Sequence, residues 1–144
     1  MKEATGKFLG KADRVIQAAE RMLACGDAEF AVGRVYYAMF YMAEALLNEK
    51  GFRFRKHGGV HGAFGEHFVK TGEFDPKYHR WLLEAFNKRI TGDYGVEAVI
   101  PPEEVGRMIE QAHEFLQAVH RYLGLLAADQ DREDFQPPGE GEQI

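Results

Sequence analysis

Residues 31–47 read AVGRVYYAMFYMAEALL, and their side chains are apolar at nearly every position. Only Gly33, Arg34 and Glu44 interrupt this apolar stretch. A helix that is apolar on nearly every side is buried on most of its faces. The sequence therefore predicts a central helix that neighbouring helices, or a second subunit, cover all round.

Amphipathic segments flank this central helix. Apolar residues recur at three- and four-residue spacing from Phe8 to Leu23, and again from Val105 to Leu123. Between them, a short helix is predicted around residues 60–69, and Asp75-Pro76 is typical of the start of a further helix. The segment TGDYGVEAVI, residues 91–100, is predicted to be a non-helical connection. No segment alternates apolar and polar residues as a strand does. The predicted fold is an all-α up-and-down bundle of four main helices and one short helix.

Length and composition indicate one soluble domain. The chain has 144 residues, of which 45% are hydrophobic and 28% charged, and its mean hydropathy is -0.40. Its one cysteine, Cys25, cannot form an internal disulfide, which fits a reducing compartment. No apolar run reaches the roughly 18 residues of a membrane span, and the first residues lack a signal peptide's apolar core. We expect a cytoplasmic protein with no membrane partner.

Charge divides the chain into a body and a tail. Residues 124–144 carry six acidic residues and one arginine, whereas residues 50–90 carry nine lysines and arginines against four acidic residues. We expect a helical domain over residues 1–123 and an acidic, disordered tail over 124–144. The basic middle is compatible with binding phosphate or nucleic acid.

Two places in the sequence suggest ligand chemistry. Arg34 lies within the central helix and must find a partner or reach solvent, because an unpaired buried guanidinium is costly. Arg89, Asp93 and Tyr94 cluster where the fourth helix ends. Arg89 and Asp93 are four residues apart and are predicted to form an ion pair. The alternative is that Arg89 holds a phosphate, aided by Lys88 and the basic 53–57 loop.

A metal centre or cofactor is not expected. His57 and His61 have the four-residue spacing of helical metal ligands, but Gly58 and Gly59 between them favour a loop. We therefore predict His57 in a loop and His61 in the short helix. Cys25 is predicted to be a small buried residue.

An ordered set of motifs resembles the HEPN domain over about residues 8–123. The motifs are Ala31-x-x-Arg34-x-Tyr36-Tyr37-Ala38-Met39-Phe40, Lys56-His57-x-Gly59-Val60, Phe64-Gly65-x-His67-Phe68 and Arg89-x-x-x-Asp93-Tyr94. The resemblance implies a five-helix bundle that forms a homodimer. It also implies a toxin-like role, with a nucleotidyltransferase encoded beside the protein as its neutralising partner. Many members of the family are metal-independent ribonucleases that use an arginine and, after four to six residues, a histidine.

This sequence departs from the family pattern at the histidine. Arg89 matches the motif's arginine, but Tyr94 follows after four residues and no histidine occurs in residues 90–112. We therefore predict a nucleotide- or RNA-binding module without nuclease activity, acting with a nucleotidyltransferase in a toxin–antitoxin-like, stress or defence system. Its predicted ligand-binding residues are Arg34, Lys56, His57, Arg89, Asp93 and Tyr94. The alternative is a metal-independent ribonuclease toxin that uses Arg89 with His57 or Tyr94.

Overall fold

The computed structural model describes residues 1–94 and 100–134, with side chains up to residue 90 in the first range and residue 128 in the second. Within these ranges the chain is helical and contains no strand, as the sequence predicts. The elements are α1 (Glu3–Ala24), α2 (Ala28–Glu49), α3 (His57–Phe64), a π-helical turn (Gly65–Val69), α4 (Pro76–Tyr94) and α5 (Pro102–Asp134).

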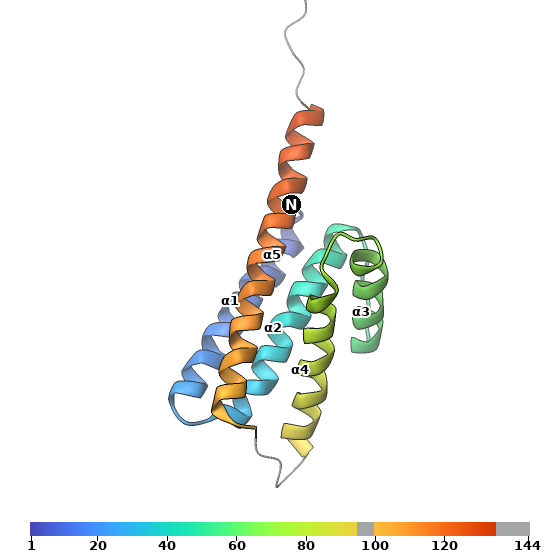
Figure 1. The fold of residues 1–144 in the computed structure, drawn as a ribbon. Coiled ribbons are helices and arrows are strands. Elements are labelled where there is room, and N and C mark those ends of the chain that lie inside the picture. Colours follow the sequence, from blue (N-terminus) through green and yellow to red (C-terminus); the bar gives the residue numbers. More distant parts are fainter. Residues whose placement is uncertain (95–99, 135–144) are drawn as a thin grey trace, which may run out of the picture.

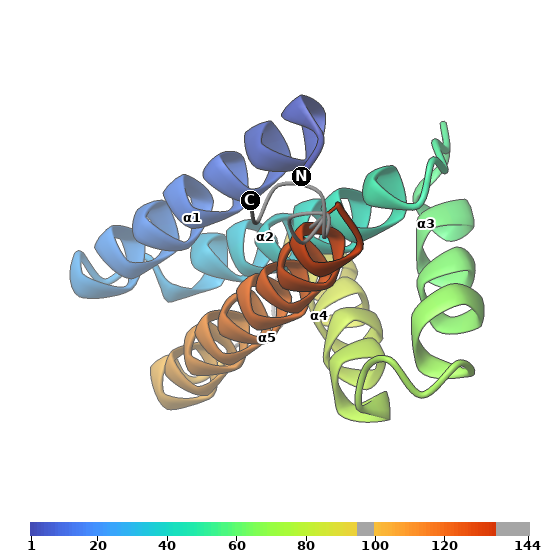
Figure 2. The ribbon, with the colours of Figure 1, turned by 90° about the horizontal axis from the view of Figure 1, so that it is seen from above.

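Helix α2 lies at the centre of the molecule. It contacts α1, α3, α4 and α5 (Figure 1). Seen from above, α1 and α3 lie on opposite sides of α2 (Figure 2). Side chains around its whole circumference are buried, including Val32, Tyr36, Met39 and Leu46. The prediction of a central helix covered all round is confirmed for most of α2. The exception is its first turns, where Phe30 is 62% exposed and Arg34 reaches solvent.

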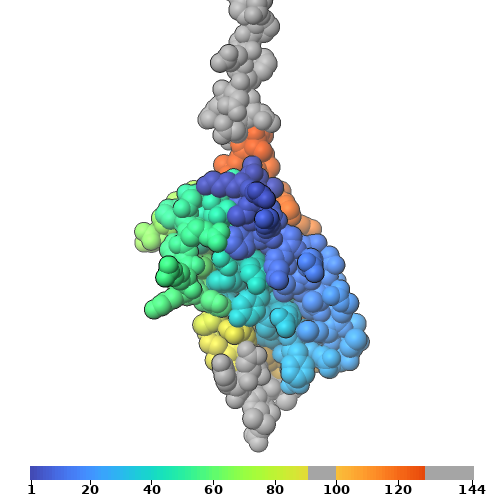
Figure 3. Space-filling view, turned by 180° about the vertical axis from the view of Figure 1, so that it is seen from behind, coloured from blue at the N-terminus to red at the C-terminus, as the bar shows by residue number. Residues whose placement is uncertain are grey.

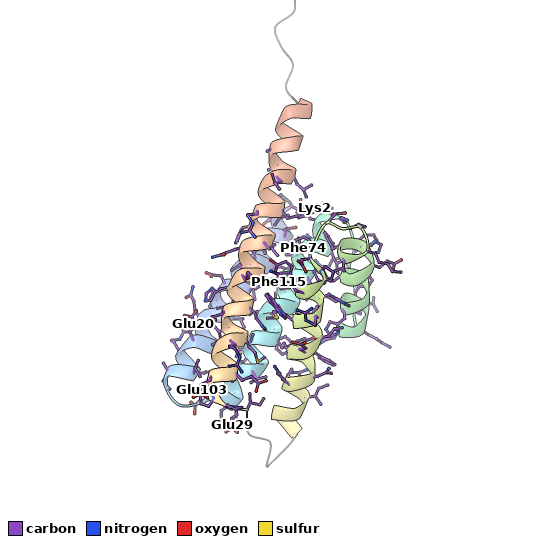
Figure 4. The ribbon with its side chains drawn as sticks, in the orientation of Figure 1. Lys2, Glu20, Glu29, Phe74, Glu103 and Phe115 are labelled. Carbon is purple, nitrogen blue, oxygen red and sulfur yellow. The ribbon has the colours of Figure 1, made fainter. Side chains whose placement is uncertain are left out.

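Aromatic rings fill the space between the π-helical turn, α4 and α5. Phe64, Phe68, Phe74 and Phe115 are buried, and their ring centroids lie about 6 Å apart. Phe74 and Phe115 face each other in this part of the core, at 6.4 Å (Figure 4). Aromatic pairs at such separations add to the stabilisation that burial itself provides. This core holds α3 and α4 in place beside α2.

Helix boundaries follow the turn residues of the sequence in most places. Gly26, Gly51 and Gly72 adopt positive φ after α1, α2 and the π-helical turn, a conformation that glycine reaches without steric cost. Asp75 caps α4 as predicted, because its Oδ1 accepts the Lys77 N–H at 2.9 Å. Asp27, in contrast, precedes α2 without a side-chain capping bond.

Three predictions about local structure are wrong. His57 begins α3 rather than lying in a loop, so both histidines of the segment are helical. Cys25 is exposed, because it follows the last turn of α1 outside the core. Residues 91–94, expected in a non-helical connection, continue α4.

The last helix is longer than its apolar pattern. Helix α5 runs to Asp134, and residues 135–144 lie outside the described residues, so the division into a domain over residues 1–123 and a tail over 124–144 stays a prediction. Leu125 and Leu126 in this extension are exposed. None of the helices in the described ranges has the length and apolar content to cross a membrane.

Candidate phosphate-binding site

A buried tyrosine hydroxyl joins two histidines near the middle of the molecule. The Tyr36 hydroxyl oxygen lies 2.9 Å from His57 Nδ1 and 2.8 Å from His61 Nε2. The hydroxyl has one hydrogen, so it donates to one ring nitrogen and accepts an N–H from the other. The two imidazoles and the phenol therefore form one continuous hydrogen-bonded chain.

Helix geometry explains why both histidines reach the same hydroxyl. His57 and His61 are four residues apart on α3, so their side chains lie one above the other on one face. That face is turned toward α2, where Phe40 stacks on the His57 ring at 4.4 Å. Phe86 of α4 packs edge-on against His61 at 5.0 Å. Aromatic packing thus fixes both imidazole rings.

The surroundings keep both histidines neutral near pH 7. Burial lowers the pKa of His57 below its usual 6.5, and the nearby Arg89 guanidinium lowers it further. Burial also lowers the pKa of His61, as do His57 and His79. Burial is the main reason that the pKa of Tyr36 is raised, so this phenol stays protonated. A neutral imidazole is able to accept a proton from a bound ligand.

Arg89 of α4 lies against the same tyrosine. Its guanidinium carbon is 5.6 Å from the Tyr36 ring centroid and 5.0 Å from that of Tyr37, distances at which a cation is attracted to an aromatic ring. Arg89 also lines a hollow of about 220 Å³ together with Arg34, Phe30, Tyr37, Met22 and Gly33. Two arginines and two aromatic rings at one opening form a site suited to a phosphorylated ligand.

The structure brings together three of the six residues predicted to bind a ligand. Arg34 and Arg89 line the same hollow, and His57 is close enough to Arg89 for the guanidinium to lower its pKa. Lys56 directly precedes His57 at the start of α3 and is exposed. Asp93 and Tyr94 are in the last turn of α4, but their side chains lie outside the described residues. The predicted Arg89–Asp93 ion pair therefore stays a prediction.

Sequence reasoning missed Tyr36 and His61 as parts of the site. Tyr36 lies within an apolar run and is fully buried, so its sequence context is that of a core residue. His61 follows His57 at helical spacing, which was the one available signal, and the intervening glycines argued against it. The described residues contain no group of three or more metal-ligating side chains, so the two histidines do not combine with further ligands there.

In its described residues the chain is thus an all-helical protein in which an arginine and two histidines surround a buried tyrosine of the central helix. The HEPN domain family model matches residues 5–122, and the chain belongs to this family. It is similar to a protein of Methanocaldococcus jannaschii named "Putative toxin MJ0142", with 37% identity over 117 residues, 81% of this chain and 80% of that protein.

Two further relatives match a shorter part of the chain. A "UPF0332 protein" of Thermotoga maritima is 42% identical over 93 residues, which is 65% of this chain and 70% of that protein. A second Methanocaldococcus jannaschii protein, named "Putative toxin MJ0605", is 36% identical over 93 residues, 65% of this chain and 69% of that protein. The recognition of a HEPN domain from sequence is confirmed.

Proposed function

We propose that this protein is a toxin-like HEPN module that binds a nucleotide or RNA phosphate at Arg89. The observation that carries the proposal is the shared hollow of Arg34 and Arg89, walled by the rings of Phe30 and Tyr37. Guanidinium groups bind phosphate oxygens through paired hydrogen bonds, and aromatic rings stack on unpaired bases. Phosphate and base contacts therefore fall within one small site.

The same proposal includes the protein's partners. Relatives named as toxins support a toxin-like role for this chain. In the proposed system the protein is a homodimer that acts with a nucleotidyltransferase in a toxin–antitoxin-like, stress or defence response. We propose that it has no nuclease activity of its own, because Tyr94 stands where the family's arginine motif has a histidine.

The placement of His57 supports a second candidate, a metal-independent ribonuclease. His57 Nδ1 contacts Tyr36, which leaves Nε2 as the nitrogen that would take a proton from a ribose 2′-hydroxyl. The 2′-oxygen would then attack phosphorus as the bond from phosphorus to the 5′-oxygen breaks, forming a 2′,3′-cyclic phosphate, and the 5′-oxygen would take a proton from water. Arg89 would stabilise the charge that develops on the phosphoryl oxygens. Here the histidine comes from α3 rather than from α4.

One experiment separates the two candidates. The unmodified protein and the variants Arg89→Ala and His57→Gln are incubated with a mixed RNA pool in EDTA, and binding to the same RNA is measured by fluorescence anisotropy. Arg80→Ala is the matched control, since Arg80 is an exposed arginine on the same helix. We expect Arg89→Ala to weaken RNA binding at least tenfold, with the affinity of Arg80→Ala unchanged and no cleavage by any protein.

Each alternative outcome has a clear meaning. Cleavage that Arg89→Ala and His57→Gln both abolish, with cyclic phosphate ends on the products, would establish the ribonuclease and overturn the non-nucleolytic proposal. Binding that is equal for the unmodified protein and Arg89→Ala would remove Arg89 from the site. Circular dichroism of each variant checks that the helical fold is kept.

A further inference from the structure

A second hollow, of about 530 Å³, lies on the face formed by α1 and the first turns of α2. Each charged side chain that lines it within the described residues is a cation: Lys11, Arg14, Arg21 and Arg34. All four are exposed, and none of them makes an ion pair with another described residue. Figure 3 shows α1 and the beginning of α2 side by side on this face.

Asp13 and Glu20 of α1 do not line this hollow. At 100° per residue, both fall on the side of α1 opposite Lys11. Asp13 accepts a hydrogen bond from Gln17, a neutral residue of the hollow's lining, and Glu20 binds His113 of α5 at 3.0 Å. Among the described residues, the charges that line the hollow itself are therefore all positive, which suits an anionic ligand.

The α1 hollow continues into the Arg89 hollow. Met22 and Arg34 line both of them, so one cationic surface extends from Lys11 on α1, across Arg34 on α2, to Arg89 on α4. A single phosphate would occupy one end of such a surface. A chain of phosphates would contact all of it, since successive phosphates of a nucleic-acid strand meet successive cations.

We infer that this surface, from Lys11 to Arg89, is a binding path for single-stranded RNA, with one base held between Phe30 and Tyr37. The choice of RNA as ligand rests on the proposed function. A single strand fits better than a duplex because only an unstacked base can enter the small aromatic hollow beside Arg34. Phe30 has the exposure that such stacking needs, at 62%. The α1 cations contact the backbone, and Arg89 holds the phosphate next to the bound base.

Charge reversal on α1 tests the part of the proposed binding path that lies outside the Arg89 hollow. The double variant Lys11→Glu/Arg14→Glu is compared with Lys70→Glu/Arg80→Glu, which has the same change in net charge on exposed residues across α2 from α1. Affinity for a labelled single-stranded RNA of about 12 nucleotides is measured at several salt concentrations. We expect at least tenfold weaker binding for the α1 variant. Its slope of log affinity against log salt should be shallower by about 1.4, because two phosphate contacts are lost.

The base-stacking part of the proposal has its own test. Phe30→Ala is expected to weaken binding about tenfold with the salt slope unchanged, because stacking releases no counterions. Leu125→Ala is the matched control, since Leu125 is another exposed large apolar residue at 67% exposure. A duplex RNA and a single-stranded DNA of the same sequence serve as comparison ligands. Duplex binding as strong as single-strand binding would overturn the inference.

The outcomes distinguish this inference from the proposed function. If Arg89→Ala weakens RNA binding and the α1 variant does not, the Arg89 site stands and the path along α1 is wrong. If the α1 variant weakens binding and Arg89→Ala does not, the path stands and the proposed site is wrong. Light scattering provides the remaining check. A change of molecular mass in the α1 variant with unchanged RNA affinity would make this face an interface between copies and overturn the inference.

Discussion

Two tyrosine-centred clusters occupy different parts of the molecule and differ in their partners. Tyr36 contacts two imidazole nitrogens within hydrogen-bond distance. Tyr122 of α5 donates to Glu73 Oε2 at 2.5 Å, and Lys50 Nζ lies 2.8 Å from Glu73 Oε1. Burial raises the pKa of both tyrosines. The Tyr122 cluster contains a carboxylate and an ammonium that balance each other, whereas the Tyr36 cluster contains no carboxylate among these hydrogen-bond partners.

The hollows beside the two clusters differ in the same way. The hollow next to Tyr122 is lined by Glu73, Asp75 and Arg121, a mixture of charges. The charged residues that line the hollow next to Tyr37 are Arg34 and Arg89. A hydrogen-bonded cluster around a tyrosine is therefore not sufficient evidence of an anion-binding site in this protein. The sign of the charge around the adjoining hollow is what indicates an anionic ligand.

The largest expected difference between the clusters is in the free energy of unfolding that is lost when each tyrosine hydroxyl is removed. Tyr36→Phe leaves His61 Nε2 without its partner in a position where the side chain is 7% exposed. A buried polar atom that loses its hydrogen bond typically costs about 1–3 kcal/mol, so we expect the free energy of unfolding to fall by about 2 kcal/mol. Urea unfolding followed by circular dichroism measures this value.

Tyr122→Phe is the matched variant. Glu73 is exposed, so water replaces the lost hydroxyl and we expect a loss of about 1 kcal/mol or less. Equal losses for the two variants would contradict the distinction between a buried hydrogen-bonded chain and a solvated one.

The clusters should also respond to pH in different ranges. Folding lowers the pKa of His57 and His61, so the unfolded chain binds protons more readily and stability falls as pH drops below about 6.5. Burial opposes ionisation of Glu73, but hydrogen bonds from Lys50 and Tyr122 outweigh it and lower its pKa. Its stabilising effect is therefore present above pH 4.5 and is lost as pH falls below that value.

Unfolding measurements between pH 8 and pH 4 check these ranges. The unmodified protein should lose stability relative to His61→Gln between pH 6.5 and pH 5, with a slope of at most about 1.4 kcal/mol per pH unit for each proton. Tyr122→Phe should keep that slope, and its stability should approach that of the unmodified protein as pH falls below 4.5 and Glu73 becomes protonated. A pH-independent difference between His61→Gln and the unmodified protein would show that His61 is not held neutral by the fold.

The local pattern of apolar and helix-capping residues in the sequence was enough to predict most of the helices. Residues 31–47 are apolar all round and form the buried centre, and Asp75 caps α4 where the sequence indicates a start. Gly58 and Gly59 misled the prediction for His57. Glycine costs a helix about 1 kcal/mol per residue, a penalty that packing of His57 against Phe40 and Tyr36 offsets. Such compensation is tertiary and leaves no trace in the local sequence.

The site was predictable only in part for the same reason. Arg89 and His57 follow from the family's motifs, but they are 32 positions apart and only the packing of α3 and α4 against α2 brings them to one tyrosine. Arg34 is exposed in the hollows that residues of α1 and α4 also line, although Ala31, Val32 and Val35 beside it in the sequence are buried. The cations of α1 are separated in sequence by ordinary helix residues, so their common hollow was not foreseen.

The smallest expected effect belongs to Lys50→Met, which removes the ammonium and keeps most of the aliphatic stem. Lys50 and Glu73 are both about 30% exposed, and ion pairs with such access to water contribute about 0.2–1 kcal/mol. We expect a loss of about 0.5 kcal/mol and unchanged affinity for single-stranded RNA, measured by urea unfolding and anisotropy. A double-mutant cycle with Tyr122→Phe should give a coupling energy below about 1 kcal/mol, because the two groups contact different oxygens of Glu73. RNA affinity reduced as strongly as in Arg89→Ala would instead place Lys50 in the binding surface, and the Tyr122 cluster would then share the role assigned to the Tyr36 cluster.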